Sequence, residues 1–157
     1  MKVGIGFDIH ALKPGKKLII GGVEIKYQSG LEGHSDADVL IHSIMDALLG
    51  AAGLGDIGIH FPNYDSKYKD ISSMILLGEV KNKIKNAGLK IINLDSVLIL
   101  EEPKISGYIP DMIKKIAEVL EMKENQINIK ATTSEGLGFC GRKEGAASQS
   151  IALLEER

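Results

Sequence analysis

Apolar and non-apolar residues alternate strictly near the start of the chain, and this alternation constrains the fold more than any other feature of the sequence. The apolar positions are Val3, Ile5, Phe7 and Ile9. A period of two is typical of a β-strand, in which successive side chains point to opposite faces. Asp8 and His10 therefore project together from the other face, which Gly4 and Gly6 are expected to keep open.

The rest of the pattern mixes strands with helices. Gly21-Gly22 between two short apolar runs predicts a hairpin over 18–25. Apolar residues spaced three or four apart predict helices over about 38–49, 71–87 and 110–120. Ser35 or Asp36 is the expected N-cap of the first helix, and Asp70 that of the second. Further strands are predicted over about 89–100, 127–131 and 145–154. This order favours an α+β fold in which helices pack on one face of a single mixed sheet.

Length and composition favour one domain over residues 1–157. Hydrophobic residues make up 44% of the chain and charged residues 25%, which is ordinary for a globular protein. The 19 basic and 21 acidic residues leave a net charge of −2, so we expect neither a nucleic-acid nor a membrane partner. One cysteine, Cys140, excludes an internal disulfide, and no apolar run could cross a bilayer. We expect a cytoplasmic protein.

Asp8 and His10 are two of the three ligands of a predicted metal site. His42 lies on a polar stripe of the predicted 38–49 helix, four residues from both Asp38 and Asp46. Asp8, His10 and His42 supply a carboxylate and two imidazoles, which leave one tetrahedral zinc position for a substrate oxygen. Asp38 and Asp46 are then the expected acceptors that orient an imidazole. Each half also has a structural alternative: a hydrogen-bonded surface pair for Asp8 and His10, and a core histidine satisfied by Asp38 or Asp46.

A second polar segment follows the strand predicted over 127–131. Thr132-Thr133-Ser134-Glu135-Gly136 offers hydroxyl and backbone N–H groups suited to phosphate oxygens, and Glu135 is suited to Mg²⁺. Thr132 and Glu135 also have capping-box spacing, so a plain helix start is the structural alternative. Arg142 is one of only two arginines, and its planar guanidinium fits either an oxyanion or a salt bridge.

Seven motifs stand in order along the chain. They are Phe7–His10, His34–Asp38, Asp46–Ala51, Gly55–Gly58, His60–Pro62, Pro103-Lys104 and Lys130–Phe139. Together they resemble the 2-C-methyl-D-erythritol 2,4-cyclodiphosphate synthase family of the non-mevalonate isoprenoid pathway. The resemblance covers essentially the whole chain.

The resemblance implies a homotrimer of α+β subunits with active sites between neighbouring subunits. The implied reaction converts 4-diphosphocytidyl-2-C-methyl-D-erythritol 2-phosphate to the cyclic 2,4-diphosphate and releases CMP. One Zn²⁺ per subunit would be held by Asp8, His10 and His42. His34 and Thr133 would be catalytic, positioning the diphosphate and stabilising its transition state.

The resemblance also implies a set of substrate contacts. Beside Asp8 and His10, the set comprises His34, Ser35, Asp56, Ile57, Gly58, Phe61, Pro62, Asn63, Tyr64, Asp65, Pro103, Lys104, Thr132, Thr133, Ser134, Glu135, Phe139 and Arg142. Residues 56–58 would face the ribose and 61–65 the methylerythritol unit. Residues 100–106 and 132–135 would form the cytidine diphosphate pocket, where Glu135 would meet Mg²⁺ or Mn²⁺. Phe139 and Arg142 would line a cavity on the trimer axis that takes an isoprenoid diphosphate.

The sequence departs from the family pattern at a few positions, and two other functions share part of it. Asn63 stands where an aspartate is common, and Glu101-Glu102 adds negative charge near the cytidine pocket. A zinc phosphohydrolase would use the same three metal ligands to activate water. A small non-enzymatic trimeric nucleotide-binding protein would need no zinc ligands, so about one zinc per chain would disfavour it.

Overall fold

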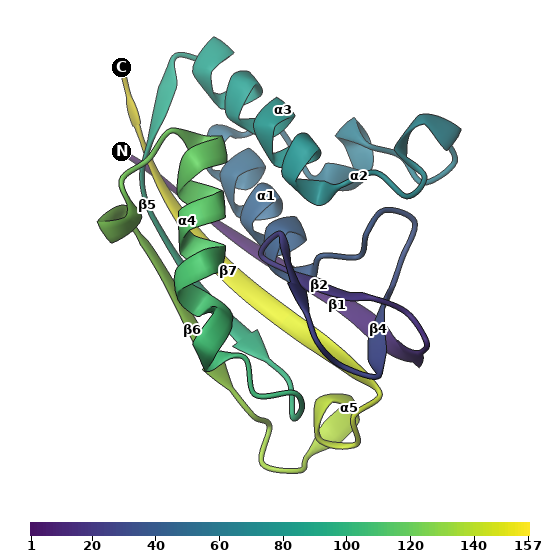
Figure 1. The fold of residues 1–157 in the computed structure, drawn as a ribbon. Coiled ribbons are helices and arrows are strands. Elements are labelled where there is room, and N and C mark those ends of the chain that lie inside the picture. Colours follow the sequence, from purple (N-terminus) through teal and green to yellow (C-terminus); the bar gives the residue numbers. More distant parts are fainter.

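A five-stranded mixed sheet organises the computed structural model, which describes residues 1–157 (Figure 1). In the order β4-β1-β7-β5-β6, its strands are Ser29–Glu32, Lys2–Pro14, Gly145–Glu156, Leu89–Ile99 and Ile127–Thr132. All neighbours are antiparallel except β5 and β6, which are parallel. The hairpin strands β2 (Leu18–Ile20) and β3 (Val23–Ile25) form a separate two-stranded sheet.

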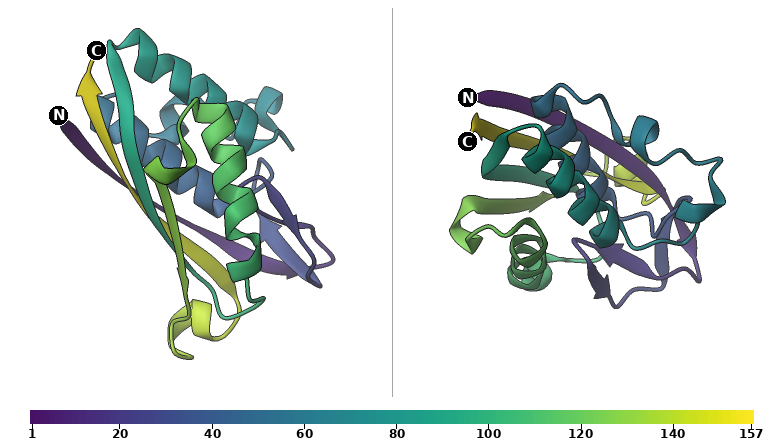
Figure 2. Two further views of the ribbon diagram at one scale, coloured as in Figure 1. Left: turned by 60° about the vertical axis from the view of Figure 1, so that its left-hand side comes forward. Right: turned by 90° about the horizontal axis from the view of Figure 1, so that it is seen from above.

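The three long helices lie on one face of the five-stranded sheet, as the views of Figures 1 and 2 agree. They are α1 (Val39–Ala52), α3 (Ser73–Asn86) and α4 (Ile109–Leu120). Two short helices, α2 (Ile57–His60) and α5 (Gly138–Gly141), and 3-10 turns at 66–68, 106–108 and 124–126 complete the chain. One core of 35 buried apolar residues joins sheet, hairpin and helices. None of the helices is both long and apolar enough to cross a membrane.

The predicted fold class is confirmed and the predicted strands and helices are present, but two helix caps were wrong. Asp38, rather than Ser35 or Asp36, caps α1, and its carboxylate accepts from the Ile41 N–H at 3.1 Å. Ser72 caps α3 instead of Asp70, whose φ of 57° removes it from the helix. Several neighbouring residues can serve as caps, so the cap is decided by which one the surrounding structure leaves in an extended conformation.

Other elements were missed or assigned differently. Strand β4 and the short helix α2 were not predicted, and neither carries a periodic apolar pattern. The capping-box spacing of Thr132 and Glu135 does not start a helix. Instead, β6 runs through Thr132, and the positive φ angles of Glu135 and Gly136 (55° and 75°) turn the chain toward α5.

Helix α1 packs directly onto β1 through the two glycines of the first strand. A β-carbon at Gly4 would lie 2.1 Å from the Ala47 carbonyl oxygen, and one at Gly6 would lie 1.9 Å from that of Ser43. Real side chains do not tolerate such distances, so only glycine permits this approach. The expectation that Gly4 and Gly6 keep the face open is therefore wrong, because the helix backbone fills that space.

A chain of buried serines fastens the same helix to the middle of the sheet. The Ser43 hydroxyl lies 2.8 Å from that of Ser148 and 2.7 Å from that of Ser150. Ser150 in turn lies 2.7 Å from Ser96 on β5. All four side chains are buried, so each hydroxyl depends on the others for its hydrogen bonds. This dependence fixes the height of α1 along the strands.

The opposite face of the sheet carries an apolar strip along β1 and β7 that the chain itself does not cover. Its members are Val3, Ile5, Phe7, Ile9 and Ile151, each between 45% and 70% exposed. Ile5 and Ile151 are directly opposed in the β1–β7 register. A contiguous exposed apolar patch of this kind marks an interaction surface.

The space around each glycine predicts opposite changes in the free energy of unfolding for two glycine-to-alanine substitutions. Gly6→Ala should lower the free energy of unfolding by about 2 kcal/mol or more, because the new methyl group forces α1 off the strand. Gly78→Ala, inside α3 with its nearest foreign atom 3.8 Å away, should raise it by up to about 1 kcal/mol. Urea denaturation at one protein concentration measures both. Equal stability of the parent and Gly6→Ala would contradict the packing described.

Candidate functional site

Three metal-ligating side chains converge where α1 crosses β1. The Asp8 carboxylate oxygen Oδ2 lies 2.9 Å from His10 Nε2 and 3.0 Å from His42 Nδ1. The two ring nitrogens are themselves 3.0 Å apart. Asp8 and His10 share a face of β1, as the period of two predicted, and the nearly buried His42 comes from the first turns of α1.

The donor set fits a tetrahedral divalent metal. Zinc bonds of 2.0–2.2 Å place tetrahedral ligand atoms about 3.3–3.6 Å apart. The three atoms of this cluster lie 2.9–3.0 Å apart, somewhat closer than that spacing. The ring of His10 is also oriented for metal binding, because its Nδ1–H donates to the Glu32 carbonyl at 2.9 Å and leaves Nε2 facing Asp8. Two nitrogens and one carboxylate oxygen thus meet around a point that suits a cation.

The pKa shifts of Asp8 and His10 both favour the charged form of the side chain. Burial tends to raise the pKa of Asp8, but hydrogen bonds from His10 and His42 outweigh burial and lower it. Burial tends to lower the pKa of His10, but the hydrogen bond and negative charge of Asp8 outweigh burial and raise it. The pocket therefore favours an ionised carboxylate with positive charge beside it.

Neither of the two aspartates expected to orient an imidazole does so. Asp38 accepts from the backbone N–H groups of Gly21 and Gly22 at 2.9 and 2.7 Å, and so anchors the β2–β3 turn. Burial raises the pKa of Asp38 to about 6, and these backbone hydrogen bonds limit the rise. Asp46 accepts from the Ile57 N–H at 2.8 Å. The helical spacing was right, but both carboxylates satisfy backbone donors of other segments.

Hydroxyl groups take the place expected for those aspartates. His42 Nε2 lies 2.9 Å from the Ser73 hydroxyl and 3.1 Å from the Ser35 hydroxyl. Ser73 is buried at the start of α3, where its hydroxyl and backbone N–H both donate to Asp36. The site role of Ser73 was not predicted from the sequence. The only available signal was the serine pair at the start of α3, which is typical of an ordinary cap.

A cavity of about 240 Å³ opens beside the metal-ligating cluster. Predicted site residues that line it with the cluster are His34, Ser35, Ile57, Gly58, Phe61 and Asn63. His34 lies outside the metal-ligating group, and its Nε2 donates to the Asp65 carbonyl at 3.3 Å. Asp46, by holding Ile57, positions the segment that contributes Gly58. The structure thus brings together the two histidine motifs and the 57–63 segment.

Four predicted residues beside this cavity do not line it. Asp56 caps α2 and accepts from the Ile59 N–H at 3.0 Å. Asp65 caps the 66–68 turn through Lys67 N–H at 2.9 Å. Tyr64 is almost fully exposed, and Pro62 is half-buried. All four lie within two residues of a cavity-lining residue in the sequence, and their contacts with a substrate stay predictions.

The predicted nucleotide-binding residues form a second, separate cavity of about 350 Å³ at the ends of β5 and β6. Its lining includes Pro103, Lys104, Thr132 and Thr133, four of the residues that the resemblance assigns to the nucleotide. Ser134 and Glu135 follow in the adjoining loop, where the Thr133 hydroxyl contacts a Glu135 carboxylate oxygen at 3.4 Å. The two cavities share no lining residue. Within one chain, the metal-ligating cluster and the nucleotide segments are therefore not in the same pocket.

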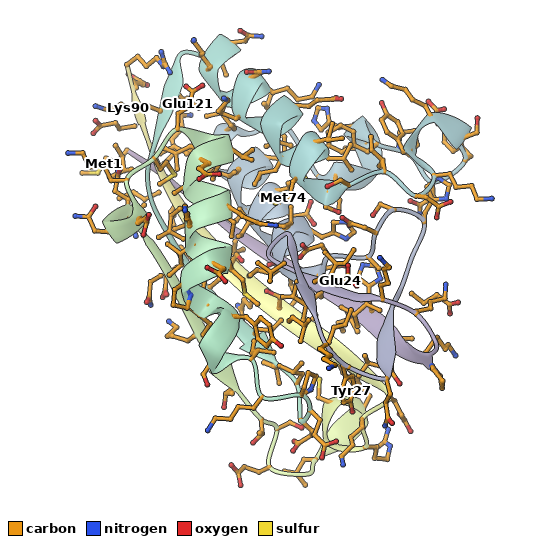
Figure 3. All side chains as sticks on the ribbon, in the orientation of Figure 1. Met1, Glu24, Tyr27, Met74, Lys90 and Glu121 are labelled. Carbon is orange, nitrogen blue, oxygen red and sulfur yellow. The ribbon has the colours of Figure 1, made fainter.

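Glu101 explains how the 132–136 loop keeps its shape. One of its carboxylate oxygens accepts from the Ser134 N–H, the Ser134 hydroxyl and the Gly136 N–H at 2.9, 3.1 and 3.1 Å. Glu102 pairs with Lys143 at 2.7 Å and accepts from Tyr27, which lies near α5 in Figure 3. The two adjacent carboxylates are thus both engaged by neighbouring residues.

Phe139 lies in α5, and Arg142 is the C-cap of that helix. The Arg142 guanidinium makes two hydrogen bonds to the Glu144 carboxylate, at 2.9 and 3.1 Å. In the isolated chain, the salt-bridge alternative for Arg142 is therefore realised. Cys140 is buried and unpaired, in agreement with a packing role.

The chain is similar to known proteins over its whole length. The YgbB family model matches residues 1–155. A protein of Clostridium novyi (strain NT) named 2-C-methyl-D-erythritol 2,4-cyclodiphosphate synthase is 59% identical over 157 residues, with 100% of both chains covered.

Solved structures agree with this relationship. The bifunctional IspDF of Campylobacter jejuni superposes with a TM-score of 0.96 at 44% identity, over 99% of this chain and 42% of that longer one. An IspF of Plasmodium falciparum, solved as a CDP complex, superposes with a TM-score of 0.87 at 36% identity, over 99% of this chain and 96% of that one.

Proposed function

The chain belongs to the YgbB family, the family of the 2-C-methyl-D-erythritol 2,4-cyclodiphosphate synthases, and we propose that it catalyses their reaction at a metal held by Asp8, His10 and His42. The activity is that of a lyase in isoprenoid biosynthesis. The convergence of these three side chains within 3.0 Å of one another is the observation that carries the proposal.

The reaction is an intramolecular phosphoryl transfer. An oxygen of the substrate's 2-phosphate attacks the β-phosphorus of the cytidine diphosphate group. The bond from that phosphorus to the bridging oxygen breaks, and CMP leaves with the electron pair. The nucleophile is already an anion, so the protein needs no strong base and has to fold the substrate, offset charge and exclude water.

The cluster supplies the electrophilic part of this chemistry. Asp8, His10 and His42 would hold a zinc ion, which would supply Lewis-acid chemistry toward the β-phosphate. His34 lies in the same cavity but outside the cluster, where its imidazole steadies the diphosphate beside the Ser35 hydroxyl. Residues 56–58 face the ribose, and residues 61–65 hold the methylerythritol unit.

The second cavity takes the nucleotide. Pro103 and Lys104 bind the cytidine diphosphate together with Thr132 and Thr133. Thr133 is the second catalytic residue, and Ser134 contributes its hydroxyl to the same loop. Glu135 would hold a Mg²⁺ or Mn²⁺ ion, which would offset the negative charge of the diphosphate. The three hydrogen bonds that Glu101 accepts from the loop support a pre-shaped nucleotide segment.

The protein assembles as a homotrimer whose active sites lie between subunits. Two observations support this assembly. The metal-ligating cluster and the nucleotide segment occupy separate cavities of one chain, so a complete site requires a second copy. The apolar strip along β1 and β7 offers a surface for that copy.

Two further features belong to the same proposal. Phe139 and Arg142 line a cavity on the trimer axis that accepts an isoprenoid diphosphate, which requires Arg142 to exchange Glu144 for the ligand. The location is cytoplasmic, in line with the unpaired Cys140.

Product analysis tests the activity. Purified protein with Zn²⁺ and Mg²⁺ should convert the cytidyl substrate into equal amounts of CMP and the cyclic diphosphate. Phosphorus NMR measures both products. A zinc phosphohydrolase would instead form an acyclic phosphate monoester with CMP. The acyclic product, or no CMP at all, would contradict the proposal.

Two histidine variants test the division of roles. His42→Ala should abolish zinc retention and most activity, because it removes a ligand from the cluster. His34→Ala should retain zinc and lose about 10²–10³-fold in turnover, the usual cost of one preorganised transition-state contact. Metal analysis and circular dichroism on both variants check these outcomes. Loss of zinc from His34→Ala with retention in His42→Ala would reverse the assignment.

A charge on the apolar strip tests the assembly. Light scattering should give the parent a mass three times that of the 16.9 kDa chain. Phe7→Glu should reduce the mass to that of one chain and abolish activity, because a carboxylate is buried at the interface. Ile75→Glu, at a comparably exposed site on α3, is the matched control and should remain trimeric. A fully active monomeric parent would overturn the shared-site arrangement.

A further inference from the structure

Asp36 and Ser73 form a hydrogen-bonded relay behind His42, and we propose that this relay fixes the tautomer in which His42 presents a bare Nδ1 to the metal. The inference rests on the proposed metal centre. Neither residue faces the point where the three metal-ligating atoms converge. Both are therefore positioning residues that act on the site through His42.

The direction of each hydrogen bond follows from counting protons. A serine hydroxyl has one proton to donate. The Ser73 hydroxyl donates that proton to the Asp36 carboxylate in a short hydrogen bond. Its oxygen can then only accept from His42 Nε2, which lies 2.9 Å away. Nε2 of His42 must therefore carry a ring proton, so the neutral form of the ring has a bare Nδ1.

Asp36 is held in place as an acceptor. Beyond the Ser73 hydroxyl, it accepts from the Ser73 N–H at 2.9 Å and from the Asp38 N–H at 3.2 Å. All three groups that form hydrogen bonds with this carboxylate are donors, so it acts only as an acceptor. Ser73 is itself fully buried, which keeps water from replacing it as the partner of His42.

The other hydroxyl beside His42 cannot decide the tautomer. Ser35 Oγ lies 3.1 Å from Nε2 and also accepts from the Ala37 N–H at 3.4 Å. No acceptor in the structure takes its proton, so this hydroxyl can turn to donate or to accept. Ser73 has no such freedom because Asp36 holds its proton.

The relay complements the backbone contact of the other imidazole. His10 donates its Nδ1 proton to the Glu32 carbonyl, which directs Nε2 to the cluster. His42 uses the opposite nitrogen and so needs an acceptor on its opposite side. With both neutral rings held in this way, each presents an unprotonated nitrogen to a metal ion. Binding then carries no free-energy cost for a change of tautomer.

Removing the hydroxyl tests the relay. Ser73→Ala should weaken zinc binding roughly 10- to 100-fold, the usual cost of losing a group that orients a metal-ligating histidine. A competing chromophoric chelator measures this affinity without reference to turnover. In metal-free protein labelled with ¹⁵N-histidine at alkaline pH, the His42 signals should change from a protonated Nε2 in the parent to a mixture of tautomers.

Two further variants separate positioning from folding. Ser72→Ala removes the neighbouring cap of α3, whose hydroxyl accepts from the Met74 N–H, and should lower stability while leaving zinc affinity and tautomer unchanged. Asp36→Asn keeps the size of the side chain. If the asparagine oxygen keeps the hydrogen bond from the Ser73 N–H, the asparagine NH₂ group faces the Ser73 hydroxyl. That hydroxyl can then no longer donate to residue 36 and must donate to His42 instead. Zinc affinity should again fall.

Zinc affinity within about threefold of the parent in Ser73→Ala, with an unchanged ¹⁵N pattern, would overturn the relay. An equal loss of affinity in Ser72→Ala would also overturn it, because the effect would then belong to the stability of α3. If the parent itself binds no zinc, the proposed metal centre fails, and the ¹⁵N pattern alone decides the relay.

Discussion

The contact between the backbones of α1 and β1 is the constraint on which the rest of this structure depends. Gly4 and Gly6 let the carbonyl groups of the helix approach the strand more closely than any side chain would permit. The same strand continues into Asp8 and His10, and the helix begins next to His42. The distance between the two halves of the metal site is therefore set by backbone packing and does not depend on flexible side chains.

Buried polar groups then fix the position of each element in this contact. Ser43, next to His42 in sequence, bonds Ser148 and Ser150, and these lie opposite Asp8 and Gly6 in the register of β7 and β1. The helix therefore cannot slide along the strand without breaking hydrogen bonds in a dry interior, where an unsatisfied hydroxyl is costly. No buried side-chain nitrogen or oxygen atom is left without a partner.

Local periodicity was sufficient to predict the first strand, the three long helices and the pairing of Asp8 with His10 on one face. The motifs, taken together, identified the family and pointed to the three residues that could hold a metal ion. The partners of buried polar groups could not be predicted in this way. Asp36 and Ser73 are 37 residues apart, and Glu101 lies 33 residues from Ser134. Asp38 and Asp46 have the right spacing for His42, yet each satisfies a backbone donor of another segment, 17 and 11 residues away in the sequence.

The central claim is that one metal ion sits at the point where Asp8, His10 and His42 converge. Crystals of the zinc-loaded protein, measured above and below the zinc absorption edge, locate the ion directly. The account predicts one anomalous peak per chain, about 2.0–2.2 Å from Asp8 Oδ2, His10 Nε2 and His42 Nδ1. A peak bound to His34, a peak at His42 Nε2, or no peak within this cluster would contradict it.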